Sequence, residues 1–224
     1  ATTAYETAKD AYDNSVMQAS IDNAKLTTAK AMLDAFAEVI VTADTLRDDI
    51  AALSTADITA ANYASEKAAA NALNARLEAL GENKGLVENA NVLSARLTEI
   101  ATFETEEIAR VENLINAIPT SVTTREEYAA ATTAYETAKA AYDNSVMQAE
   151  IEGAKLTAAE AMLTAFAERN EAADEVDALI AKIAASVATR EEYAAEKADY
   201  DAAKAAYDTC EAKELVTKAN DLTT

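Results

Sequence analysis

The fold of this chain is decided by residues 131–168, which read ATTAYETAKAAYDNSVMQAEIEGAKLTAAEAMLTAFAE. Residues 1–38 read ATTAYETAKDAYDNSVMQASIDNAKLTTAKAMLDAFAE and are identical to them at 31 of 38 positions. The substitutions, such as Asp10 to Ala140, mostly change polar character, whereas the Tyr, Met, Leu and Phe positions stay the same. A close internal copy of this kind is the signature of a repeat architecture, so we expect one supersecondary unit to recur along the chain.

The tyrosines give the length of the repeat, because Tyr63, Tyr128 and Tyr193 are 65 residues apart. Within a unit they recur at heptad spacing, which places their rings on one face of a helix. In the second unit an alanine and a leucine replace two of them, which favours packing over chemistry; the alternative is an aromatic face that binds a sugar or a protein. The predicted core stripe is Tyr63, Tyr128, Tyr135, Tyr142, Tyr193, Tyr200 and Tyr207.

Each unit is predicted to contain three helices. In the third unit the first helix covers residues 106–118, where aliphatic residues recur at i, i+3, i+4 and i+7, and Pro119 prevents its continuation. The second helix opens at Thr124, which forms a predicted capping box with Glu127. A short loop leads to the third helix.

The same capping pattern recurs one period later, at Thr189 and Glu192. Thr59 holds the corresponding place in the second unit, without the glutamate. All three glycines of the chain fall between the second and third helices of a unit, where the chain must reverse.

No Pro, Gly or turn cluster interrupts residues 24–53, 86–118 or 154–183. The third helix of one unit is therefore predicted to continue into the first helix of the next. At about 1.5 Å per residue, three such helices predict a rod on the order of 150 Å, a spectrin-like all-α array of three-helix bundles.

The predicted units are residues 1–42 (a partial repeat with the second and third helices), 43–103, 104–170 and 171–224 (a partial repeat with the first, second and the start of the third). Because the first and last units are partial, each is expected to expose an apolar groove.

Composition excludes several classes of function. The 224 residues carry 19 Lys and Arg against 40 Asp and Glu, and the net charge of −21 disfavours nucleic acid and anionic lipid surfaces as partners. With no His, no Trp and only Cys210, the chain lacks the common nucleophilic and zinc-binding sets, so we expect no enzyme, no catalytic or metal site and no cofactor. No apolar run approaches the ~20 residues that span a bilayer.

The third unit resembles the small three-helix modules found in tandem in large surface proteins and secreted carbohydrate-active enzymes of Gram-positive bacteria. The resemblance rests on LINAIPTSVTTREEYAAATTAYETAKAAYD at residues 114–143, and on the Leu-Val pairs at residues 86–87 and 215–216. Only the third unit keeps the proline of the Pro-x-x-Val-Thr turn. The resemblance implies an extracellular stalk at the cell surface or cell wall, and it carries over no catalytic residue.

Two functions follow from these observations. The first is a non-catalytic spacer that projects an adhesive or catalytic domain, with flanking domains of the same polypeptide as its partners. The second is an adhesin module that binds a host surface protein or a glycan through an exposed helical face. Substitutions between the copies are scattered over charged and polar positions, which favours the spacer.

Overall fold

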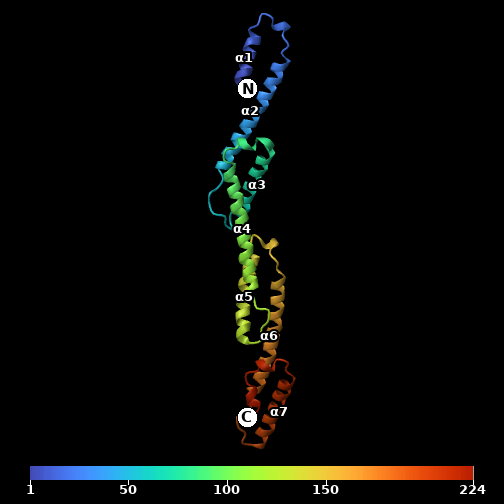
Figure 1. Cartoon of the computed structure of the whole chain (residues 1–224). Helices are drawn as coiled ribbons and strands as arrows, with labels where there is room; N and C mark the ends of the chain where they lie inside the picture. The colour runs from blue at the N-terminus through green and yellow to red at the C-terminus, as the bar shows by residue number, and fades with distance from the viewer. Residues whose placement is uncertain (224) are drawn as a thin grey trace. The chain divides into compact units, whose positions relative to one another are not determined.

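The computed structural model describes residues 1–223, and all its regular elements are helices (Figure 1), which confirms the predicted all-α class. Short 3₁₀ turns occupy Gln18–Ser20, Gly81–Leu86, Gln148–Glu150, Lys213–Leu215 and Ala219–Leu222. The α-helices are α1 (Thr2–Asp13), α2 (Ala24–Ala51), α3 (Tyr63–Ala79), α4 (Ala90–Asn116), α5 (Arg125–Asp143), α6 (Ala154–Ile180) and α7 (Arg190–Thr209).

The chain forms two compact units, residues 1–105 and 106–224. In the first unit, α2 packs against α1 and also against α3. Its second half supplies the buried side chains Ala43, Leu46 and Ile50. The remaining apolar core of this unit consists of Tyr63, Ala70, Leu73, Val87, Leu93 and Ile100.

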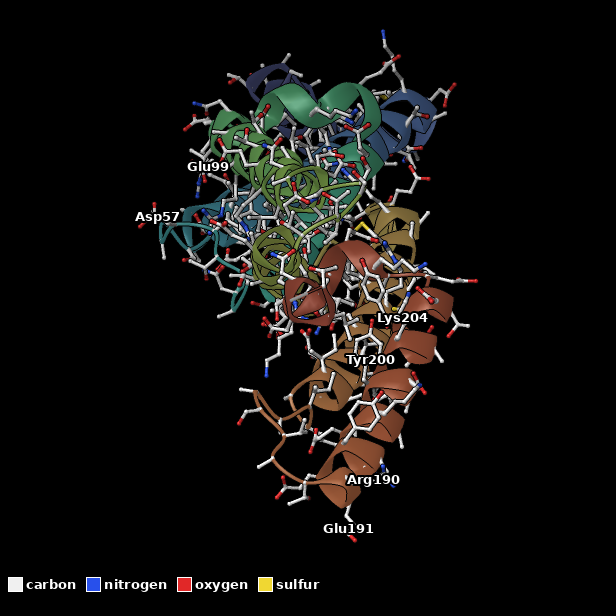
Figure 2. The ribbon with its side chains drawn as sticks, turned by 90° about the horizontal axis from the view of Figure 1, so that it is seen from below. Asp57, Glu99, Arg190, Glu191, Tyr200 and Lys204 are labelled. Carbon is white, nitrogen blue, oxygen red and sulfur yellow. The ribbon has the colours of Figure 1, made fainter. Side chains whose placement is uncertain are left out.

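In the second unit, α6 packs against both α5 and α7. Leu163 and Phe166 lie in its first half and Val176 and Ile180 in its second, and all four belong to one apolar core. Figure 2 shows Tyr200 and Lys204 on α7. Tyr200 packs against the same core, and its hydroxyl donates to the carbonyl of Leu222 at 3.3 Å. One long helix therefore serves two helical pairs.

The three uninterrupted helices appear where the sequence predicts them, as α2, α4 and α6. Each predicted boundary between repeats falls inside one of them. They end two or three residues early, because Leu53, Ile118 and Ile183 each donate a backbone hydrogen bond to the residue three before them, in a tight closing turn. These three residues are 65 apart, so the turn is part of the repeat. Residues 86–89 are not part of α4: Leu86 ends a 3₁₀ helix, and a turn at residues 88–89 leads into α4.

Both predicted capping boxes are present. The side chains of Thr124 and Thr189 accept from the backbone N–H of the residue three ahead, and Glu127 and Glu192 complete the boxes. Hydrogen bonds from Thr123 hold the pKa of Glu127 below its usual range. In the predicted repeat of residues 43–103, Asn62 stands at the place of this glutamate. Its Oδ1 accepts from the N–H of Thr59 at 2.7 Å, and α3 starts only at Tyr63.

Replacing Thr124 by Ala is expected to lower the free energy of unfolding by about 1 kcal/mol, because a helix N-terminus loses its side-chain acceptor. Thr133→Ala, on the exposed surface of α5, is the control and should change stability by less than about 0.5 kcal/mol. Urea unfolding followed by circular dichroism measures both. Equal effects of the two substitutions would contradict the role of the cap.

Candidate functional site

The tyrosine stripe is not uniformly buried. Tyr63 is buried, and five others are partly buried: Tyr128, Tyr135, Tyr142, Tyr200 and Tyr207. The rings of Tyr63 and Phe103 lie 5.4 Å apart, and Tyr128 stacks on Phe166 at 5.1 Å. A tyrosine at the start of the second helix thus packs on a phenylalanine of the third.

Tyr193 departs from the core prediction, since it is 57% exposed. It holds the place of Tyr63 and Tyr128 in its unit, but the part of the chain that the structure describes supplies no phenylalanine to face it. The reverse holds at Phe36, the counterpart of Phe166, which is 47% exposed. Burial of the tyrosine or phenylalanine at these repeat positions therefore depends on whether the partner ring is present, and not on the position in the repeat alone.

Replacing Tyr128 by Ala is expected to lower the free energy of unfolding by about 2–4 kcal/mol, because it removes a stacked ring from the core. Tyr193→Ala tests the same repeat position without a partner and should change stability by less than about 0.5 kcal/mol. Chemical unfolding of the two variants makes the comparison. A similar loss in both would mean that Tyr193 also packs in solution.

A polar cluster surrounds Tyr63. The Tyr63 hydroxyl donates to Glu104 Oε1 at 2.6 Å and accepts from Lys67 Nζ at 2.9 Å, and Lys67 pairs with Glu104 at 2.7 Å. The hydrogen bond from Lys67 holds the pKa of Glu104 below its usual range, and burial raises the pKa of Tyr63. Every member has its partner within the cluster. The arrangement joins α3 to α4.

A second polar cluster joins the C-terminal segment to the last turn of α6. The carboxylate of Asp177, only 9% exposed, accepts from Thr217 N at 3.0 Å, Thr217 Oγ1 at 2.7 Å and Lys218 N at 2.8 Å. Burial alone would raise the pKa of Asp177, but these hydrogen bonds outweigh it and hold that pKa below its usual range. Nearby, Arg125 of α5 donates to Asp174 of α6.

The first unit uses the same arrangement with different chemistry. Asn89 stands two residues after the Leu-Val pair at 86–87, as Lys218 does after the pair at 215–216. Its Nδ2 donates to the carbonyl of Arg47 in α2 at 2.8 Å. In both units, the segment after the Leu-Val pair is thus tied to the long helix by buried or partly buried hydrogen bonds. Sequence reasoning identified the Leu-Val pairs but not Asp177.

Replacing Asp177 by Asn is expected to lower the free energy of unfolding at pH 7 by about 1–3 kcal/mol, because charge-assisted hydrogen bonds are lost. A carboxylate with a lowered folded pKa stabilises fully above its unfolded pKa of about 3.9, and this stabilisation is lost as pH falls through the folded pKa. The difference between the two proteins should therefore shrink at about pH 2.

Denaturant unfolding at both pH values measures this difference. Glu175→Gln, an exposed carboxylate on the same helix, is the control and should have little effect at either pH. A loss in Asp177→Asn that is the same at pH 7 and pH 2 would contradict the role of the charge.

An open groove of ≈ 700 Å³ lies between α1 and α2. Its polar members are Ser15, Asp22 and Lys25. The other lining residues are mostly apolar: Ala1, Ala4, Tyr5, Ala8, Ala11, Tyr12, Ile21, Leu26, Ala29, Met32 and Leu33. The groove expected in the partial first repeat, residues 1–42, is therefore present.

The groove expected in the last predicted repeat, residues 171–224, is covered by the chain itself. Ala212, Leu215, Val216 and Leu222 lie buried in the core that α6 and α7 share. The 3₁₀ turns after α7 thus cover this core in place of the third helix, of which the sequence predicted only the start in residues 171–224. Among residues 171–223, the large apolar side chains that remain exposed are Val187 and Tyr193.

No cluster of His, Cys, Asp and Glu able to hold a metal ion occurs within residues 1–223. Over the same range, none of the helices combines the length and apolar character needed to cross a bilayer. Comparison of the chain with protein-family models, with curated proteins and with solved structures gave no match.

Proposed function

We propose that the chain is a non-catalytic spacer of a bacterial surface or secreted protein, built from three-helix repeats that share long helices and hold flanking domains apart. The observation that carries the proposal is the sharing of α6 by α5 and α7 without a break. A continuous helix between two packed pairs resists bending, because a bend would break its backbone hydrogen bonds. The cell-surface location rests on the resemblance of the third predicted repeat, residues 104–170, to stalk modules.

The polar ties along the second half of α6 support the same proposal. Asp177, together with the pairs Arg125–Asp174 and Arg169–Glu214, joins α6 to α5 or to the C-terminal segment where one helical pair gives way to the next. Each exposed pair contributes little alone. Together they hold three segments in one arrangement at the point where a spacer must not bend.

The distribution of substitutions favours a spacer over a binding module. All seven residues of 1–38 that differ from 131–168 are exposed, and none lies in the apolar core. They occur on α1, on the loop and on α2, and only Asp22 among them lines the groove between α1 and α2. Outside the groove they are scattered over charged and polar positions, whereas a polar recognition surface for a host protein or glycan would be expected to keep its residues constant.

Small-angle X-ray scattering tests the spacer. A rod of stacked repeats on the order of 150 Å predicts a radius of gyration of roughly 40 Å, against about 17 Å for one compact globule of this length. Inserting Gly-Ser-Gly-Ser after Asn170, inside α6, should reduce the radius by introducing a hinge. The same insertion after Ser186, in the loop between α6 and α7, is the control and should leave it unchanged. A radius near the compact value in the unaltered chain would overturn the proposal.

A further inference from the structure

Residues 1–38 and 131–168 form the same helical hairpin in two settings. Their loops have nearly the same backbone, with φ/ψ of −104°/18° at Met17 and −106°/17° at Met147. The loop ends are also alike, at −96°/126° for Ile21 and −97°/132° for Ile151. The face of the hairpin is therefore shaped by the hairpin itself.

In the 131–168 copy, the last three turns of α4 lie on this face. Ser145 Oγ donates to Glu107 Oε1 at 2.9 Å, and Lys155 Nζ donates to the carbonyl of Asn116 at 3.0 Å. Between these two contacts, Val111 and Ile115 are 0% and 3% exposed. The helix is thus held by a polar contact at each end and by aliphatic side chains between them.

In the 1–38 copy the same face is open. Met17 is 60% exposed where Met147 is 8%, and Ile21 is 43% exposed where Ile151 is 5%. Ser15 and Lys25, the counterparts of Ser145 and Lys155, line the groove. Within residues 1–223, Lys25 takes part in no ion pair, whereas Lys9 and Lys30 each pair with an aspartate.

We propose that the groove between α1 and α2 is a docking site for an amphipathic helix with the side-chain pattern of residues 106–118. Branched aliphatic residues at the places of Val111 and Ile115 fill the apolar floor. A glutamate at the place of Glu107 accepts from Ser15, and the carbonyl end of the helix accepts from Lys25. This gives the chain a recognition role that a spacer alone does not need.

A fluorescent peptide of residues 104–120 tests the site against the full chain by fluorescence anisotropy. We expect saturable one-to-one binding with a dissociation constant on the order of 100 µM, because the peptide must order as it binds. Ile115→Asp in the peptide should weaken binding at least about tenfold, since it places a charge on the apolar floor. Ala109→Asp adds the same charge at an exposed position and is the matched control. It should change affinity by less than about twofold.

Two measurements on the full chain locate the bound peptide. Lys25→Ala should weaken binding about threefold to tenfold, whereas Lys30→Ala, outside the groove, should not. Saturating peptide should also slow oxidation of Met17 by hydrogen peroxide, with buried Met147 as the internal reference.

Three outcomes would overturn the proposal. The first is no binding at about 1 mM peptide, and the second is equal binding of the Ile115→Asp and Ala109→Asp peptides. The third is a dimer of the chain, detected by light scattering, that protects Met17 from oxidation without peptide, because the occupant would then be a second copy.

Discussion

Two helices joined by a short loop cannot bury their apolar faces on each other alone, and the rest of this structure depends on that constraint. The chain shows it directly, because nearly the same 38 residues occur twice. Where α4 lies on the hairpin, Ala138 is 0% exposed and Ile151 is 5%. In the 1–38 copy, which no third segment within residues 1–223 covers, the corresponding residues Ala8 and Ile21 are exposed. The difference in burial comes from the third segment rather than from the hairpin.

A long helix such as α6 buries apolar side chains against two partners, α5 along one half and α7 along the other. The first half of α6 buries Leu156 and Leu163, and the second half buries Val176 and Ile180. Between them, residues 168–175 read ERNEAADE and are largely exposed. At this polar crossover, charged side chains such as Arg169 and Asp174 form ion pairs with other segments. The middle of the helix is thus held by polar contacts where apolar packing is weakest.

Much of this was predictable from the sequence, and the failures have a physical cause. Breaker-free runs predict the three long helices, and Thr-x-x-Glu predicts the caps, because both signals are local. Tyr193 follows the same repeat as Tyr128 and is nonetheless exposed, because burial requires a phenylalanine from another segment. Asp177 escaped notice since its hydrogen-bond donors lie 40 residues away. Residues 212–222 form 3₁₀ turns and lack the helical spacing of apolar residues, so the sequence pattern did not predict that they cover the pair formed by α6 and α7.

The negative charge fits a chain whose surface is mostly helix and whose cores are small. With 40 acidic and 19 basic residues, like charges on neighbouring repeats repel, and this repulsion opposes collapse of one repeat onto another. Several basic residues pair within one helical turn, as in Lys139–Asp143 and Lys204–Asp208, and such pairs do nothing to draw distant repeats together. Such local pairs add only a few tenths of a kcal/mol each to a helix. Net charge therefore acts on this molecule mainly as repulsion, so a helix that docks on it would have to gain most of its binding free energy from apolar faces such as the groove between α1 and α2.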